Sequence, residues 1–517
     1  MRTSPVVMSL AAPVSARTSS IRFSQSRHSN AAAILLALVP SFVKLIYYSH
    51  NIGSDDAYIH LQIARNILSG HNWGLNPNMP VNMSSSPAFT LLLTVVSALT
   101  PHAIPVMQVL SCVASTLGLF LIYSTVHSET NSVPIGLASE AAAALSCDLW
   151  RWNGTLMEAS FAFFIVALLL FLARRNRITL SQQLGTGVIA GWAILLRPEL
   201  SLAAALYAVV SALRTEPRSR ITSLLVFSAG STTVVVPWIV FAERNFNSWL
   251  PTTFYAKSVP HFILWNPHLL KQFLELTAES FFWPALTTIW LVSLLLMRGS
   301  KRTRRSYLLP VSLLSSVLGF YYLKTPGLES PGRYLLPFLP CAALIFGLVL
   351  RDSALYIGYR RLVMVAFTVT VLQCATSLAI NQVFLAPALS RFENEYADTM
   401  RSAANYLAGR IRSPKESVLV EVDVGVLAYA ANGRFHIYDG GGLASPKLAH
   451  LALEEQLQLV QPAYLIESQG VETGEWEGQD GGRLHSIWSR RYKQHSVSQS
   501  APYLFANIYL ISDSQKN

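Results

Sequence analysis

The stretch Ala31–His60, AAAILLALVPSFVKLIYYSHNIGSDDAYIH, joins a long apolar segment to two adjacent carboxylates, Asp55 and Asp56. An apolar run of this length predicts a membrane-spanning helix. Carboxylates directly beyond such a run are costly unless they stay hydrated or find partners. We therefore expect a membrane protein with a polar site at the outer mouth of its helices.

The composition indicates a polytopic membrane protein. Apolar residues make up 52% of the 517 residues and charged residues only 13%, whereas a soluble domain carries about 25% charged residues. The net charge of +11 does not indicate a nucleic-acid partner, because most basic residues lie in short clusters between apolar segments. The four cysteines fall inside apolar runs, which favours buried core residues over a disulfide or metal framework.

Eleven membrane-spanning helices are predicted, at 31–50, 103–126, 133–149, 156–173, 184–197, 200–214, 223–241, 281–297, 307–323, 336–350 and 362–386. Prolines bracket a shorter apolar segment, 87–100, which we interpret as an interfacial or re-entrant helix, with a full span as the alternative. With eleven spans, every basic cluster falls on the cytoplasmic side. A span at 87–100 would move the clusters at 174–177 and 214–220 outside.

Three regions follow from this reading. Residues 1–30 are Ser- and Arg-rich and predict a disordered cytoplasmic tail before a retained helix, rather than a cleaved targeting sequence. Residues 31–387 form the transmembrane domain, with outer loops at 51–86 and 243–280. Residues 388–517 predict an α/β domain outside the membrane, with helices at 390–412 and 446–458 and strands at 418–422, 463–467 and 503–511.

The first outer loop carries the most telling residues. From Asp56 to Leu68 the apolar residues have helical spacing, which predicts a short helix in the membrane interface. A carboxylate at the start of a helix commonly caps it, and this accounts for one of the two aspartates. The other carboxylate is then available for chemistry. His60 lies on the same helix, where a histidine is more often a bystander.

Other polar residues lie at outer ends of predicted spans: Glu158 before the fourth, Arg197 and Glu199 between the fifth and sixth, Lys257 before the eighth and Arg333 before the tenth. Arg197 with Glu199 is also typical of a local ion pair, and single cations at span ends commonly anchor at the headgroup level. Taken with the aspartates, these residues indicate a base beside a phosphate-binding site.

Several short motifs resemble one superfamily in their order and sidedness. They are Asp55-Asp56-Ala57-Tyr58-Ile59, Gly154-Thr155-Leu156-Met157-Glu158, Leu196-Arg197-Pro198-Glu199, Leu250-Pro251-Thr252-Thr253-Phe254-Tyr255-Ala256-Lys257 and Gly332-Arg333-Tyr334-Leu335-Leu336-Pro337, followed by segments at 423–429 and 437–443. The chain resembles the polytopic GT-C glycosyltransferases, and within them the bacterial branch that contains the mycobacterial terminal arabinofuranosyltransferases. It departs from that pattern at Thr252, where asparagine is usual, and in the three glycines after Asp439.

The resemblance implies an enzyme of the bacterial cytoplasmic membrane that moves a sugar from a polyprenyl-phosphate donor to a cell-envelope acceptor on the outer face. It implies that Asp55 or Asp56 is the base or positions the acceptor, since a hydroxyl attacking an anomeric carbon must lose its proton. The candidate donor-phosphate ligands are Lys257, Arg333 and Arg197, and the candidate supporting residues are Glu158, Glu199, His60, Tyr58, Tyr255 and Asp423. Inversion or retention, and a divalent metal ion at Asp55 or Asp56, are left open.

Two other classes of protein fit the composition. A transporter or flippase for a lipid-linked sugar would more often show repeats and broken helices at the middle of the membrane. Here the polar residues gather at one surface, which favours chemistry over passage. A receptor whose helices only anchor an outer domain would not need eleven spans.

Overall fold

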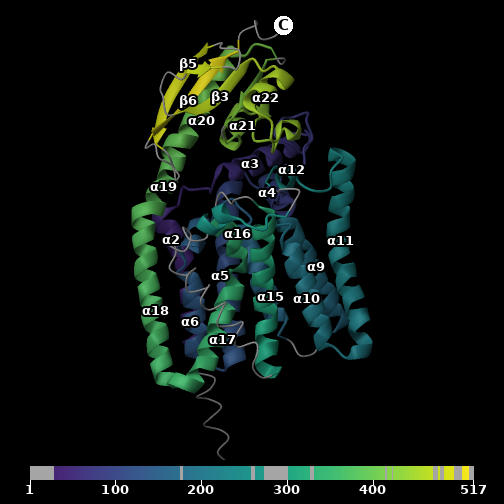
Figure 1. Cartoon of the computed structure of the whole chain (residues 1–517), viewed down its shortest axis with the longest axis vertical. Helices are drawn as coiled ribbons and strands as arrows, with labels where there is room; N and C mark the ends of the chain where they lie inside the picture. Colours follow the sequence, from purple (N-terminus) through teal and green to yellow (C-terminus); the bar gives the residue numbers. More distant parts are fainter. Residues whose placement is uncertain are drawn as a thin grey trace, which may run out of the picture.

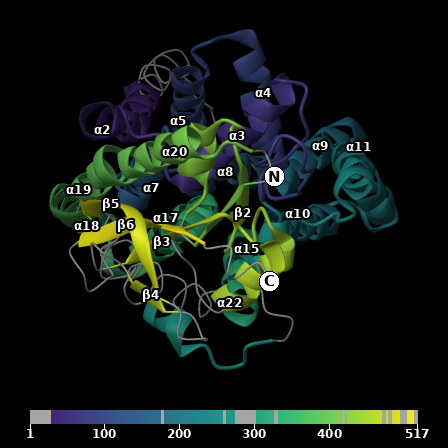
Figure 2. The ribbon, with the colours of Figure 1, turned by 90° about the horizontal axis from the view of Figure 1, so that it is seen from above.

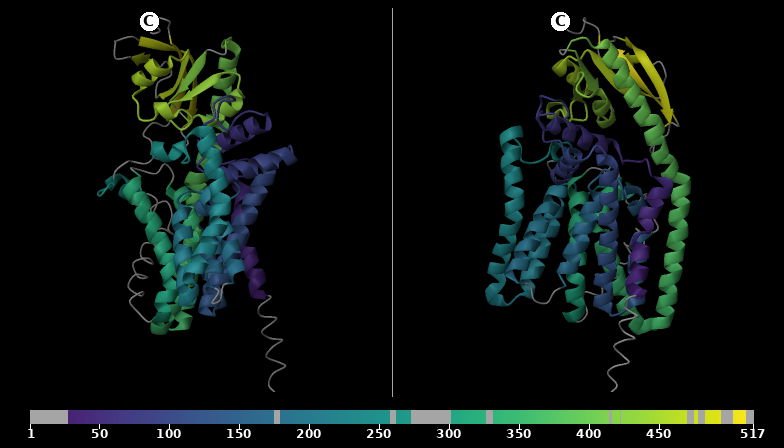
Figure 3. Two further views of the ribbon diagram at one scale, coloured as in Figure 1. Left: turned by 90° about the vertical axis from the view of Figure 1, so that its right-hand side faces the viewer. Right: turned by 180° about the vertical axis from the view of Figure 1, so that it is seen from behind.

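Long apolar helices form a bundle, and a small α/β domain covers one end of it (Figures 1 and 3). The computed structural model describes residues 28–174, 179–257, 262–272, 301–325, 331–413, 416–421, 423–469, 475–477, 483–493 and 503–511. The predicted tail up to residue 27 and the predicted span at 281–297 lie outside these ranges.

Six helices in the described part of the chain are long and apolar enough to cross a membrane. They are His28–Tyr47, which contains α2 (Val39–Tyr47), α5 (Ala103–Thr130), Pro217–Phe246, which contains η1 (Pro217–Ser219) and α11 (Arg220–Phe246), Ser306–Lys324 within α15 (Lys301–Lys324), Gly332–Ala354 and Tyr359–Arg410. Apolar side chains of α11 such as Ile221 and Leu225 are exposed, as expected for a helix that faces lipid. The prediction of a multi-pass helical membrane protein is confirmed.

Five shorter apolar helices among the described residues pack against these six or against one another. They are α4 (Pro87–Leu99), α6 (Val133–Ala144), α8 (Ala159–Leu172), α9 (Leu180–Leu196) and α10 (Leu200–Arg214). The predicted span 133–149 is divided into α6 and the one-and-a-half-turn α7 (Cys147–Trp152). Helix α4 has 13 residues and is therefore about 20 Å long, shorter than the hydrocarbon core. It lies at the end of the bundle beneath α3 (Asp55–Leu68), which fits the interfacial reading of 87–100 (Figure 1).

Basic clusters mark the end of the bundle that lies away from the α/β domain. The connections from α10 to α11 and from α17 (Leu339–Ile357) to α18 (Tyr359–Ile380) lie at the end away from the α/β domain (Figure 1). They carry the predicted basic clusters, including Arg218 and Arg360. The opposite end holds α3, α4, α12 (Thr252–Lys257) and α16 (Pro331–Leu335), which continues through η2 (Leu336–Phe338) into α17.

A single helical rod links the bundle to the outer domain. Helix α18 continues through π-helical η3 (Asn381–Leu385), α19 (Ala386–Arg391) and π-helical η4 (Phe392–Ala397) into α20 (Asp398–Arg410). The predicted change of character at Pro387 therefore falls inside the rod rather than at a break. The π-helical η3 ends two residues before Pro387, which has no backbone N–H to donate, and the helix nevertheless continues through α19.

The outer domain is built on a six-stranded sheet of order β2-β1-β3-β6-β5-β4. The central β1 (Ser417–Val420) pairs in parallel with β2 (His436–Asp439) and β3 (Tyr464–Gln469), and β6 (Tyr503–Leu510) continues antiparallel to β3. Beyond them lie β5 (Arg483–Lys493) and β4 (Glu475–Glu477). Helices α21 (Gly425–Ala431), η5 (Pro446–Leu448) and α22 (Leu453–Val460) connect the parallel strands. Seen from above, the domain and α20 lie over the part of the bundle around α8 and α17, with α9, α10 and α11 to one side (Figure 2).

Candidate active site

A cavity of about 520 Å³ opens where the bundle meets the outer domain. One wall carries charged side chains from α3 and α16, from the start of α8 and from the turn that follows α9. The rest of the lining is largely apolar and includes Leu202, Trp249, Leu250, Phe254 and Phe320. Leu443 of the outer domain also lines the cavity, so the first loop, the 249–256 segment and the outer domain all contribute residues to it.

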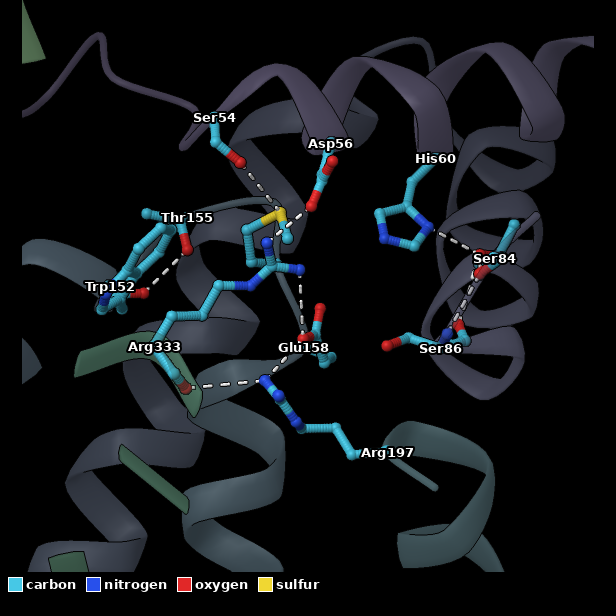
Figure 4. Close-up of polar contacts among 12 residues, drawn as sticks. Ser54, Asp56, His60, Ser84, Ser86, Trp152, Thr155, Glu158, Arg197 and Arg333 are labelled. Carbon is cyan, nitrogen blue, oxygen red and sulfur yellow. Dashed lines mark hydrogen bonds and ion pairs between the residues drawn. The ribbon is translucent and has the colours of Figure 1, made fainter. Parts of the chain in front are cut away.

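The charged wall is one chain of alternating ions (Figure 4). Arg333 donates to Asp56 at 2.6 Å and lies 3.4 Å from Glu158. Arg197 lies 3.0 Å from the same oxygen of Glu158 and pairs with Glu199 through its Nε. Five of the predicted site residues therefore meet in one network, although they come from segments nearly 280 residues apart.

Local sequence explains how these side chains converge. Glu158 is the residue just before α8. Helix α9 ends at Leu196, because Pro198 disfavours the helical conformation for Arg197 before it. At Gly332, a Cβ atom would collide with a carboxylate oxygen of Asp148, so glycine lets α16 approach α7 closely and places Arg333 inside. Gly53, at φ +130°, packs against Met157 and Thr155 and joins the first loop to the segment before Glu158.

The network largely neutralises its own charges. Glu158 is 1% exposed and Arg197 5%, and a buried ion needs an opposite charge close by. The two guanidinium groups balance two of the three carboxylates, Asp56, Glu158 and Glu199. Tyr321 donates to Glu199 at 2.6 Å and supports the third. Asp56 is 32% exposed and is the member that opens most to solvent.

Asp55 has a different structural role from Asp56. Its carboxylate accepts the backbone N–H groups of Gly425 at 2.5 Å and Val426 at 2.8 Å, at the start of α21. A Cβ at position 425 would collide with the backbone oxygen of Asp55, so only glycine permits this contact. Burial, followed by the nearby Asp423, raises the pKa of Asp55 well above its usual range. Of the two carboxylates that the sequence left open, the structure places Asp56 in the cavity and Asp55 under the outer domain.

Other predicted residues also serve the contact between the domains. Tyr58 donates to Glu393 at 3.1 Å and accepts from Arg401 at 2.7 Å, and Tyr396 donates to the backbone oxygen of Asp423. Tyr255 is half-exposed, and only its backbone oxygen meets His450. Lys257 ends α12, and its side chain lies outside the described part of the structure.

His60 lines the cavity one turn after Asp56 and is only 4% exposed. Its Nδ1 lies 2.7 Å from the hydroxyl of Thr90, which in turn lies 2.9 Å from the hydroxyl of Ser84. Burial lowers the pKa of His60, so the ring is neutral at pH 7.

Lys324 is a cavity residue that sequence reasoning missed. It lies at the end of α15, and its ammonium group is 4.3 Å from the centre of the Phe262 ring. Within the described ranges, no carboxylate forms an ion pair with it. A single lysine closing an apolar run carries no pattern that distinguishes it from a headgroup anchor. The described residues also contain no group of three or more His, Cys, Asp and Glu placed to hold a metal ion.

Comparisons with known proteins connect this chain to others by fold only. Neither a protein-family model nor a curated protein matches its sequence. Among solved structures, ArnT from Cupriavidus metallidurans in the apo state is 12% identical, with a TM-score of 0.53 over 95% of this chain and 98% of that one. The same protein bound to undecaprenyl phosphate gives a TM-score of 0.52.

An archaeal enzyme shows the same likeness. The Archaeoglobus fulgidus oligosaccharyltransferase, tethered to an acceptor peptide, is 12% identical, with a TM-score of 0.51 over 89% of this chain and 74% of that one. Both neighbours are glycosyltransferases of the GT-C type. The expected GT-C-like fold, a helical membrane domain with a small C-terminal sheet domain, is confirmed.

Proposed function

We propose that this protein is a membrane glycosyltransferase that moves a sugar from a polyprenyl phosphate to a hydroxyl-bearing acceptor of the cell envelope. The observation that carries the proposal is the ion chain from Asp56 to Glu199, which lines one cavity together with apolar side chains at the outer end of the bundle. A charged wall beside an apolar one suits a substrate with a sugar phosphate head and a lipid tail.

The solved neighbours support the same classes of substrate. ArnT was crystallised with undecaprenyl phosphate and the oligosaccharyltransferase with an acceptor peptide, so the fold accommodates a lipid phosphate and an acceptor. The motif resemblance to arabinofuranosyltransferases makes a pentofuranosyl donor the first one to test. We infer a bacterial cytoplasmic membrane with the cavity and sheet outside, because the basic connections lie at the opposite end.

The residues divide into roles by their contacts. Asp56 takes the proton of the acceptor hydroxyl or positions that hydroxyl, since it is the most exposed carboxylate of the network. Lys324 and Arg333 stabilise the negative charge that develops on the departing phosphate. Arg197 and Glu199 hold Glu158 in place, and Glu158 holds the other side of Arg333. Lys257 remains a candidate phosphate ligand on its sequence position.

Transfer assays test this function. Purified protein in lipid nanodiscs is incubated with radiolabelled polyprenyl-phosphate sugars, beginning with a pentofuranosyl donor, and release of the sugar from the lipid is followed. We expect turnover that Asp56→Asn lowers at least tenfold while Asp55→Asn retains it. Absence of turnover by the wild type with every donor, together with no binding of polyprenyl phosphate, would reject the proposal.

A further inference from the structure

A short hydrogen-bond network through Thr90 fixes the orientation of the His60 ring. Thr90 offers one hydroxyl proton, and its oxygen lies within hydrogen-bond distance of Ser86 O at 3.3 Å, Ser84 Oγ at 2.9 Å and His60 Nδ1 at 2.7 Å. A carbonyl oxygen can only accept, so the Thr90 proton goes to Ser86. The assignment that satisfies all three contacts then has Ser84 and His60 Nδ1–H donating to Thr90.

This network leaves the other ring nitrogen, Nε2, unprotonated and with a lone pair that can accept a hydrogen bond. In a neutral imidazole with the proton on Nδ1, Nε2 is an acceptor. No hydrogen-bond partner for Nε2 is found among the described residues, and the ring lines the cavity. Figure 4 shows one nitrogen of His60 on the side of Ser84 and the other turned toward the space beside Glu158 and Arg333.

We propose that His60 Nε2 is the general base that takes the proton of the acceptor hydroxyl, and that Asp56 with Arg333 positions the reacting groups. This inference rests on the proposed function. As the acceptor O–H bond breaks, its proton goes to Nε2 and its oxygen bonds to the anomeric carbon of the donor. The bond from that carbon to the phosphate oxygen breaks, and its electron pair leaves with polyprenyl phosphate.

The contacts of the two candidates favour His60 over Asp56. One oxygen of Asp56 is held by Arg333 at 2.6 Å, so protonating this carboxylate would weaken a charge-assisted bond. Protonating Nε2 breaks no contact with a described residue. The imidazolium that forms faces Asp56 on its own helix and Glu158 on α8, which stabilise it, while Arg333 on α16 opposes it. In the resting site, burial outweighs these charges and keeps the ring neutral.

Kinetics of variants separate a base from a residue that only packs. His60→Gln is expected to lower kcat about 100-fold or more, with a much smaller change in donor KM, and to remove the fall in kcat/KM on the acid side of the pH profile. Thr90→Val should lower kcat because Nδ1–H loses its acceptor, whereas Thr90→Ser, which keeps a hydroxyl, should restore it. His71→Ala, an exposed histidine of the same loop, is the matched control.

A measurement without turnover tests the same point. In protein labelled with ¹⁵N-histidine, the resonances missing from His60→Gln belong to His60, and their shifts distinguish the two tautomers. A protonated Nδ1 and a free Nε2 near pH 7 are expected. An Nε2–H tautomer, or a His60→Gln variant with near-normal kcat and an unchanged acid limb, would overturn the assignment. If the wild type turns over in the same assay, the proposed function stands, and only the assignment of His60 as the base is overturned.

Discussion

Asp55 and Asp56 are neighbours in the chain, but their carboxylates belong to different structures. Asp55 accepts two backbone N–H groups at the start of α21 in the outer domain, whereas Asp56 pairs with Arg333 in the cavity. Successive residues of a helix point about 100° apart, so a pair at the start of α3 can serve both sides of the contact. One motif thus joins the docking of the domain to the site below it.

Exchanging each aspartate should separate activity from stability. Asp56→Asn is expected to lower kcat at least tenfold with little change in melting temperature, because the partly exposed carboxylate leaves Arg333 with Glu158 still beside it. Asp55→Ala should retain chemistry in the folded fraction and lower the free energy of unfolding by about 1 kcal/mol, the usual value of a lost helix cap. Both are measured by transfer assays and thermal unfolding in nanodiscs; the reverse pattern would place the chemistry at Asp55.

The sequence was sufficient to predict the membrane class, the gathering of polar residues at one end of the bundle and the residues of the ion chain. Hydropathy and basic clusters report directly on burial in a bilayer, so these features need no tertiary information. Strand β2 was not predicted because four residues beside three glycines carry too little periodicity. Strand β5 was missed because its sequence, RLHSIWSRRYK, is largely polar.

Which carboxylate enters the cavity could not be predicted, because it depends on a contact with Gly425, 370 residues away. Lys324 was missed for a similar reason: its place in the cavity depends on how α15 packs beside α10. For Arg197 and Arg333 the sequence identified the residues but not their partners. Their sequence positions indicated phosphate ligands, but the structure shows that each already holds carboxylates.

Removing Arg197 should destabilise the protein more than it weakens donor binding. Arg197→Met leaves Glu199 and Glu158 short of a partner in a buried site, and breaking a buried pair from one side costs about 3–5 kcal/mol. Arg174→Met is the control, because its pair with Glu129 is partly exposed and such pairs contribute about 0–1 kcal/mol. Thermal unfolding in nanodiscs compares the two, and equal shifts would contradict a structural role for Arg197.

Docking of the outer domain should weaken as the pH rises. The pKa of Asp55 is raised in the folded protein, so its contribution is fully present below the ordinary aspartate pKa and is lost as the pH passes through the raised value. Asp55→Asn cannot ionise and keeps an acceptor oxygen. The melting temperature of this variant, relative to wild type, should therefore improve between pH 5 and pH 8. A difference that does not change with pH would show that Asp55 is ionised throughout.

Lys324 should be the cation that matters most for holding the lipid phosphate. The guanidinium groups of Arg197 and Arg333 are engaged by carboxylates, while the ammonium group of Lys324 meets an aromatic ring and lines the same cavity. A hydrogen bond to a charged group contributes about 1.5–3 kcal/mol, so Lys324→Met should weaken binding of polyprenyl phosphate by about 10- to 100-fold. Lys324→Arg keeps the charge and should lose much less. Binding of the lipid phosphate without its sugar measures the phosphate contact alone, and unchanged affinity in Lys324→Met would return the role to Arg333 or Lys257.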